Sequence, residues 1–277
     1  MIKLKEDWEF NVFGVYNYNK PGRFDSIIKF IRDNHRNIDG DILEAGVFRG
    51  SSLLGIGMLL KELGSTKKVY GFDSFSGFPP IHNEKDEASQ FEVMYKNQQI
   101  SSNHIKAVRK NQLIISSLND KKELPSTDKI SSSTNFNNTS KQFVQNRIDL
   151  LELDNIILVD GPFSETMNIH NDALSKFMAV ILDCDLYQSY IETFKFVWKN
   201  CEPGSFIFLD EYYSLKFPGA RVATDEFLKK NKSAKLIMDE HIQGDFERWH
   251  IIKSWLEVLK TKEKKISYIP LYSFENC

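Results

Sequence analysis

The chain has 277 residues, a length that suits one α/β domain with an insertion, and we expect a single domain over residues 1–277. Its hydrophobic fraction of 41%, with 21 Phe and 10 Tyr, can fill a sizeable core. A formal net charge of −2 argues against a nucleic-acid partner. The 3 scattered cysteines argue against a disulfide framework and a Cys-x-x-Cys metal site. So few cysteines fit a reducing, cytoplasmic setting. No stretch is long and apolar enough for a membrane span, so we expect no membrane partner.

Short apolar runs alternate with segments of helical period, which is the pattern of βαβ units. After an N-terminal helical cap over 1–40, we expect strands at 41–47, 68–73, 155–160, 178–183, 205–210, 235–239 and 247–253. We expect helices near 51–63, 143–152, 165–175, 188–200 and 220–230. The last two strands are too close for a helical crossover and should pair antiparallel. The prediction is an α/β fold with a doubly wound, mostly parallel seven-stranded sheet and an antiparallel last strand.

Residues 80–142 interrupt this alternation between the second and third predicted strands. So long a connection inside a compact domain is usually a lid, a binding element or disorder, although a tolerated surface insertion is equally compatible with the sequence. Its tail over 126–141 reads STDKISSSTNFNNTSK, the composition of a flexible linker. We expect the insertion to form a lid or to shape a substrate pocket.

The first predicted strand leads into the turn LEAGVFRGSS, residues 43–52. Ligands of open α/β sheets bind beyond the carboxyl ends of the strands, so this turn is a candidate binding element. Gly46 and Gly50 allow the backbone close to a ligand, and Ser51 or Ser52 can cap the next helix. The glycine spacing is not that of a pyrophosphate site, and Glu44 would repel a phosphate. S-adenosylmethionine, with an ammonium, a sulfonium and no phosphate, suits this turn; a glycine turn kept for steric reasons alone is the alternative.

Two further strand ends extend this candidate site. Asp73, in VYGFDSFSGFP, stands where nucleoside-binding folds place an acid on the ribose hydroxyls, although a solvated Asp capping a turn fits as well. In VDGPFSETM we expect Gly161 and Phe163 to line the adenine side, with Ser164 as a helix N-cap.

The runs AVILDCDLYQSY and SFIFLDEYY both end in acids followed by an aromatic residue. Asp183, Asp210 and Glu211 should therefore meet at one edge of the sheet, where their mutual repulsion calls for a cation. Oxygen ligands without a nearby His or Cys pair select Mg²⁺, Mn²⁺ or Ca²⁺ over zinc. If the strand persists, Asp185 shares a face with Asp183 and can act as general base, while Cys184 points away as a packing thiol. Helix capping by these acids is the alternative.

Six motifs in this order resemble the macrocin O-methyltransferase family, from about residue 40 to 253: ILEAGVFRGSS, VYGFDSFSGFP, VDGPFSETM, LDCDLYQSY, PGSFIFLDEYY and PGARVATDEF. The resemblance implies a class I methyltransferase (Rossmann-like) fold. It also implies S-adenosylmethionine-dependent, Mg²⁺-dependent methylation of a hydroxyl, with a sugar or glycoside as the typical acceptor. Mn²⁺ is the alternative ion. Residues 80–142 fall where such enzymes build the acceptor pocket.

The resemblance implies metal ligation by Asp183, Asp210 and Glu211, with Asp185 as the catalytic base. The cofactor contacts that we expect are Glu44, Ala45, Gly46, Gly50, Ser51, Ser52, Asp73, Ser74, Gly161 and Phe163. The chain departs from the family pattern at Glu211, where two consecutive Asp are common, and at Gly50–Ser51, where two glycines are usual.

Two other functions compete with a sugar O-methyltransferase. A catechol-type phenol O-methyltransferase would place a Lys shortly after the first metal acid, whereas this chain has Leu186, Tyr187 and Gln188. A nucleoside-binding protein that kept the fold and lost the chemistry is the alternative outside enzymes. Arg221 is expected near the acids for charge balance only. Trp8, Phe10 and Phe13 could serve a homodimer interface or the core.

Overall fold

The computed structural model describes residues 2–79, 83–118, 124–169, 176–239 and 246–254. The strands are β1 (Asp41–Ala45), β2 (Val69–Asp73), β3 (Ile156–Asp160), β4 (Phe177–Leu182), β5 (Cys201–Leu209), β6 (Ala234–Met238) and β7 (Trp249–Lys253). The α-helices are α1 (Asp7–Phe13), α2 (Asp25–Asn34), α3 (Ser51–Glu62), α4 (Gln90–Lys96), α5 (Ser102–Leu118), α6 (Lys141–Leu150), α7 (Phe163–Ile169), α8 (Tyr187–Asn200) and α9 (Pro218–Lys230). Within these ranges, no helix combines the length and the apolar character that a bilayer crossing needs.

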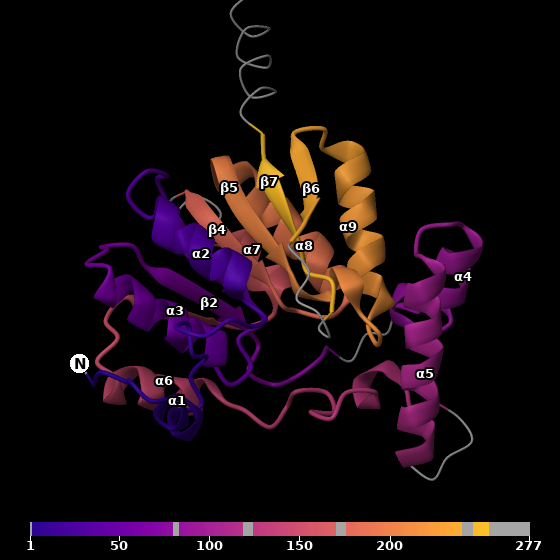
Figure 1. Ribbon diagram of the computed structural model, residues 1–277, viewed down its shortest axis with the longest axis horizontal. Coiled ribbons are helices and arrows are strands. Elements are labelled where there is room, and N and C mark those ends of the chain that lie inside the picture. The colour runs from indigo at the N-terminus through magenta and orange to yellow at the C-terminus, as the bar shows by residue number, and fades with distance from the viewer. Residues whose placement is uncertain (1, 80–82, 119–123, 170–175, 240–245, 255–277) are drawn as a thin grey trace, which may run out of the picture.

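The strands form one seven-stranded sheet in the order β3-β2-β1-β4-β5-β7-β6 (Figure 1). Neighbours from β3 to β5 pair in parallel, while β7 pairs antiparallel with both β5 and β6. From β1 the strand order runs outward through β2 to β3 on one side and through β4 to β5 on the other, so the order reverses at the β1 and β4 pair. Open α/β sheets bind their ligands at such a point. The predicted doubly wound sheet with an antiparallel last strand is confirmed.

Alternation along the strands separates two apolar layers. Ile42 packs in the cluster that α2, α3 and α6 share with one face of the sheet, and the next residue, Leu43, packs in the cluster of α7, α8 and α9 on the other. All of β4 is buried, as expected of a central parallel strand. Figure 1 shows α2 and α3 on the near side of the sheet and α7 and α8 behind it.

The predicted elements differ from the structure mainly at their ends. The helix expected at 165–175 begins two residues earlier, at Phe163, and residues 170–175 lie outside the described residues. Strand β5 begins at Cys201, four residues before the predicted start. In α1, Phe10 is buried in the core whereas Trp8 is exposed; the homodimer stays a prediction.

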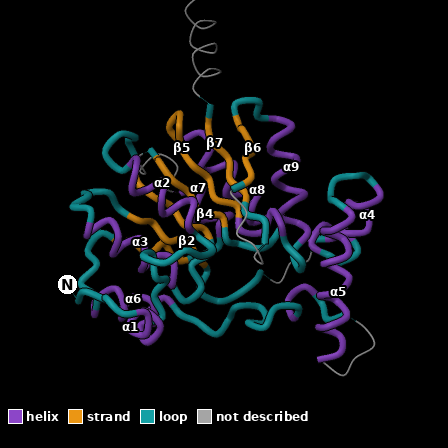
Figure 2. Tube along the Cα trace, in the orientation of Figure 1, coloured by secondary structure: helices purple, strands orange, loops and turns teal. Residues whose placement is uncertain are grey.

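Helices α4 and α5 belong to the insertion and stand to one side of the sheet (Figures 1 and 2). Helices α4 and α5 enclose a small apolar cluster of their own, against which Leu215 and Val222 pack. In α5, the Nε2 atom of His104 lies 2.7 Å from the Ser214 carbonyl, and its ring stacks on Tyr213 at 4.0 Å. The insertion therefore contacts the segment that directly follows the acids at the end of β5.

Gly46, which directly follows β1, lies close against the backbone that follows β4. Its φ of +92° belongs to the left-handed region, and an added Cβ would lie 1.8 Å from the Asp183 carbonyl oxygen. Because that oxygen belongs to the backbone, a side chain here must push the two strand ends apart.

We expect Gly46→Ala to lower the free energy of unfolding by about 3 kcal/mol or more, from strain and displacement together. Gly64→Ala is the matched control, because Gly64 has a φ of +63° but no heavy atom within 4 Å of its added Cβ. It should cost about 1 kcal/mol, the conformational penalty alone. Urea unfolding measures both values, and equal costs would contradict the close approach at Gly46.

Candidate active site

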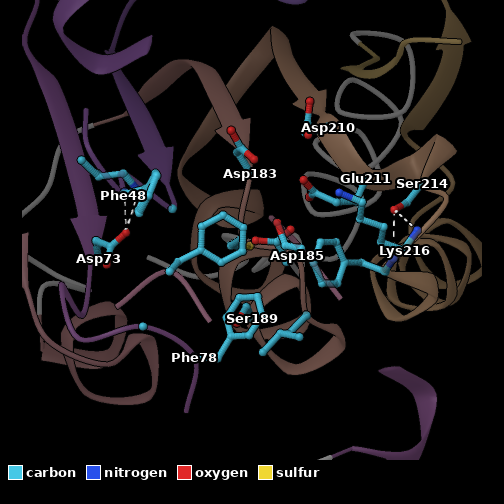
Figure 3. Close-up of a pocket in the computed structure, with 18 of the residues that line it drawn as sticks. Phe48, Asp73, Phe78, Asp183, Asp185, Ser189, Asp210, Glu211, Ser214 and Lys216 are labelled. Carbon is cyan, nitrogen blue, oxygen red and sulfur yellow. Dashed lines mark hydrogen bonds between the residues drawn. The ribbon is translucent and has the colours of Figure 1, made fainter. Parts of the chain in front are cut away.

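A cavity of about 1250 Å³ opens at the carboxyl ends of the parallel strands (Figure 3). A drug-sized ligand usually occupies a pocket of about 300–1000 Å³, so this cavity has room for two ligands side by side. One part of its wall is the turn after β1 with the ends of β2 and β3, and another is the acidic ends of β4 and β5.

The turn after β1 provides backbone and serine hydroxyls to the first part of the wall. Gly46, Ser51 and Ser52 line the cavity. The N-cap of α3 is Gly50, with a φ of +77° and no side-chain capping bond, so the prediction that Ser51 or Ser52 caps this helix was wrong. Both serines lie inside the first turn because the left-handed Gly50 already ends the loop. Ser164 likewise lies within α7, which begins at Phe163, and does not cap it.

Glu44 is completely buried behind this turn and does not line the cavity. Its Oε1 atom accepts a hydrogen bond from the Ser52 hydroxyl at 2.5 Å, while its Oε2 atom has no hydrogen-bond partner. Burial raises the pKa of Glu44 to about 8, and the Ser52 hydrogen bond opposes this shift. Glu44 thus has one oxygen without a partner, and of this hydrogen-bonded pair only Ser52 lines the cavity. This arrangement fits a cationic ligand such as the ammonium group of S-adenosylmethionine.

Asp73 holds the turn in place through hydrogen bonds to its backbone. Its Oδ2 atom accepts from the N–H groups of Val47 and Phe48, each at 2.8 Å, and its Oδ1 atom accepts from Phe75 N–H at 2.6 Å (Figure 3). Asp73 also lines the cavity, so lone pairs beyond these three bonds face the ligand space. Its predicted contact with ribose hydroxyls stays a prediction.

The other predicted cofactor residues divide into two groups. Ser74, Gly161 and Phe163 line the cavity. Ala45 is buried within β1, and Gly50 approaches Val144, so neither of these residues forms part of the cavity wall.

The three predicted metal ligands meet as expected. Asp183, Asp210 and Glu211 each offer a carboxylate oxygen within 4.8 Å of the others. Their strand ends are adjacent because Leu182 and Leu209 pair directly in the sheet. A set of oxygen ligands of this size suits a hard divalent ion, so the residues present fit Mg²⁺ or Mn²⁺.

Asp185 reaches the cavity by a different route from the one predicted. Strand β4 ends at Leu182, so strand alternation does not place Asp183 and Asp185 on a shared face. Instead Asp185 has a φ of +58°, a left-handed conformation that is uncommon outside glycine, although Asp adopts it more readily than most residues. Asp185 and Asp183 line the cavity together with Cys184, which is nonetheless buried. Among the described residues, no side chain pairs with the Asp185 carboxylate.

The closeness of these acids shifts their protonation. Burial, and then repulsion from Asp210, Asp185 and Asp183, raises the pKa of Glu211 well above its ordinary value. Burial and repulsion from Asp183 and Asp210 raise the pKa of Asp185 in the same way. The Tyr190 hydroxyl contacts the Glu211 Oε2 atom at 2.6 Å and so orients this buried carboxyl. A bound cation would oppose these shifts, because it favours the ionised carboxylates.

No pattern in the sequence pointed to the arginines that lie beside the acids. The Arg248 Nη1 atom is 3.5 Å from the Asp210 Oδ1 atom. Arg23, in the loop between α1 and α2, forms ion pairs with both Asp183 and Asp210. Arg221, which we expected near the acids, instead contacts Tyr212 and the Gln99 carbonyl and pairs with Asp225 at 3.7 Å. Arg23 lies 160 residues before Asp183, and only the fold brings the two together.

The protonation of Glu44 provides a test of the cofactor side. The carboxyl ordinarily ionises near pH 4.5, but burial raises the folded-state pKa to about 8. Between these values the folded state keeps a proton that the unfolded state has lost, so this group lowers stability as pH rises. Glu44→Gln removes the titration and keeps an acceptor for Ser52. We expect the melting temperature of Glu44→Gln, measured relative to that of the wild type by scanning calorimetry, to rise between about pH 5 and about pH 8. A difference that stays constant with pH would contradict a buried, uncharged carboxyl.

Comparison with known proteins shows the family of this chain. The family model described as macrocin-O-methyltransferase (TylF) matches residues 22–124 and 117–248. A curated relative from Streptomyces olivaceus, 8-demethyl-8-(2,3-dimethoxy-alpha-L-rhamnosyl)-tetracenomycin-C 4'-O-methyltransferase, is 24% identical over 177 residues, or 63% of this chain. The chain spans about half the length of that relative, 54%.

Two solved structures share the fold. The O-methyltransferase NovP aligns with a TM-score of 0.56 and 18% identity, over 82% of this chain and 78% of its own. CalS11, a calicheamicin methyltransferase, aligns with the same TM-score and identity, over 83% of this chain and 76% of its own. The family model covers most of the chain, including the turn after β1 and all three clustered acids. The chain therefore belongs to the macrocin O-methyltransferase family.

Proposed function

We propose that the chain is an S-adenosylmethionine-dependent O-methyltransferase that uses a divalent cation, Mg²⁺ or Mn²⁺, to methylate a hydroxyl of a sugar or glycoside. The observation that carries this proposal is the single cavity that joins the turn after β1 to the clustered acids of β4 and β5, in a chain of this family. The curated relative is named as a methyltransferase of a rhamnosyl-bearing compound, which supports a sugar acceptor.

The cofactor side of the cavity suits a cation better than a phosphate. Gly46, Ser51 and Ser52 offer backbone and hydroxyl groups, with the Glu44 carboxyl directly behind Ser52. Asp73 fixes the turn through Val47 and Phe48. We infer that this wall holds the methionine and ribose parts of the cofactor, and that Gly161 and Phe163 flank the adenine.

On the acidic side, Asp183, Asp210 and Glu211 would hold the divalent ion, and Asp185 would take the proton of the acceptor hydroxyl. When bound, S-adenosylmethionine supplies a methyl group on a cationic sulfur, and a divalent ion lowers the pKa of a hydroxyl that it contacts. Asp185 is free to accept this proton because no side chain among the described residues engages its carboxylate. Its left-handed turn directs it into the cavity with Asp183.

An apolar wall favours a ring-shaped acceptor. Phe48, Phe78, Phe136 and Phe217 line the cavity, and the Phe136 ring lies 5.2 Å from both the Phe48 and Phe78 rings. Aromatic faces pack well against the C–H faces of sugars and exclude water from the reacting atoms. Phe78 and Phe136 belong to or border residues 80–142, so we propose that this insertion shapes the acceptor pocket.

Substitution of the proposed base separates chemistry from binding. We expect Asp185→Asn to reduce the turnover of a sugar acceptor by about 10²–10⁴-fold, the usual contribution of general-base catalysis. Cofactor affinity, measured by calorimetric titration, should change little. Asp154→Asn is the matched control, since Asp154 is 84% exposed and pairs with Lys61 on the surface. Full activity in Asp185→Asn would exclude this residue as the base.

Metal binding is tested separately from catalysis. We expect Asp210→Asn to weaken Mn²⁺ binding, followed by electron paramagnetic resonance, by more than about 100-fold, because loss of outer-sphere partners alone costs about 10–100-fold. S-adenosylmethionine should still bind, since its proposed contacts lie on the other wall. Unchanged Mn²⁺ affinity would rule out the acid cluster as the metal site, and a wild type that fails to bind S-adenosylmethionine would overturn the methyltransferase assignment.

A further inference from the structure

Arg23 occupies the space between the carboxylates that we assign to the metal. Its Nη2 atom lies 2.7 Å from the Asp183 Oδ2 atom and pairs with the Asp210 Oδ2 atom as well. Its Nε atom donates to the Asp210 Oδ1 atom at 2.5 Å. The guanidinium therefore binds Asp210 through two nitrogens and bridges it to Asp183, the geometry in which Arg pairs most strongly with carboxylates.

A divalent ion and this guanidinium compete for the same oxygens. Mg²⁺ binds carboxylate oxygens at about 2.0–2.1 Å. An ion between the Oδ2 atoms of Asp183 and Asp210 would occupy the position that the Nη2 nitrogen now fills. It would also bring two positive charges into contact, so Arg23 must leave before the ion can bind both acids.

The loop that carries Arg23 also contacts the cofactor wall. Tyr16 donates its backbone N–H to the Ser51 carbonyl at 3.0 Å, and its side chain lines the cavity. The Tyr16 ring packs on Phe24 at 5.1 Å, and the Arg23 guanidinium lies over the Phe24 ring at 4.9 Å. Release of Arg23 therefore removes one anchor of a segment, residues 15–24, that spans both walls of the cavity.

We propose that Arg23 is a resident counter-ion of the acid cluster, which a divalent metal displaces, and that this exchange releases the segment 15–24 from the acidic wall. The proposal rests on the proposed function only in that Asp183, Asp210 and Glu211 bind a divalent ion. In the metal-free state Arg23 offsets part of the charge of Asp183 and Asp210 and holds these two side chains in place. In the metal-bound state it no longer contacts them. The observed affinity for metal is thus the intrinsic affinity multiplied by the fraction of molecules in which Arg23 does not contact the acids.

Titration of Mn²⁺ by electron paramagnetic resonance tests the competition directly. We expect Arg23→Gln to bind Mn²⁺ about tenfold more tightly than the wild type or better, because the guanidinium that bridges Asp183 and Asp210 is gone. Arg248, whose Nη1 atom lies 3.5 Å from the Asp210 Oδ1 atom, remains in both proteins. Arg23→Lys keeps the charge and should fall between the two. Lys20→Gln is the matched control: it removes one positive charge from the same segment, but Lys20 pairs with Asp7 on the surface. It should leave Mn²⁺ affinity unchanged.

Hydrogen exchange provides a second readout, and its measurement on the wild-type protein does not depend on how any variant folds. Saturating Mn²⁺ should increase amide exchange in residues 15–24, and Arg23→Gln should show the increase without metal. The proposal is overturned if Arg23→Gln binds Mn²⁺ no more tightly than the wild type, or if Mn²⁺ binds with no change in exchange of the segment. If neither the wild type nor any variant binds Mn²⁺, the metal site and the displacement of Arg23 are both ruled out. S-adenosylmethionine binding remains a separate measure of the methyltransferase assignment.

Discussion

The structure around the cavity depends on the repulsion among carboxylates that the sheet forces together. Parallel pairing of β4 with β5 brings Asp183 beside Asp210 and Glu211, with a carboxylate oxygen of each within 4.8 Å of the others. Such a cluster needs protons or a cation to be stable. The raised pKa of Glu211 shows one solution and Arg23 shows another. A bound divalent ion would be a third solution, and it would use the same carboxylate oxygens that Arg23 now contacts.

The cofactor wall meets a different constraint, the close approach of β1 and β4. Gly46 permits that approach, and the three backbone hydrogen bonds of Asp73 hold the turn that results. Glu44 lies behind the turn with one oxygen unpaired. A bound cation would favour the ionised form of this buried carboxyl. The two walls thus have related electrostatics, because each presents carboxylates whose charge a positively charged ligand would stabilise.

The insertion and the N-terminal loop complete the cavity from outside the sheet. Helix α5 holds the segment after Glu211 through His104, Tyr213 and Ser214. Tyr16 and Arg23 connect the cofactor turn to the acids from the opposite end of the chain. The proposed acceptor pocket and the proposed displacement of Arg23 therefore depend on segments outside the sheet. Such segments can differ between proteins without changing the order of the strands.

The sequence by itself determined the sheet, its antiparallel last strand and the meeting of Asp183, Asp210 and Glu211, because apolar runs of strand length fix which residues follow each strand end. It did not determine how Asp185 reaches the cavity, since a left-handed residue after β4 breaks the alternation on which that prediction depended. Nor did it reveal that Gly50 rather than a serine caps α3. Only the tertiary structure placed Arg23 beside the acids. Its ion pairs join residues 160 and 187 positions apart, and contacts at such separations produce no local periodicity or spacing in the sequence.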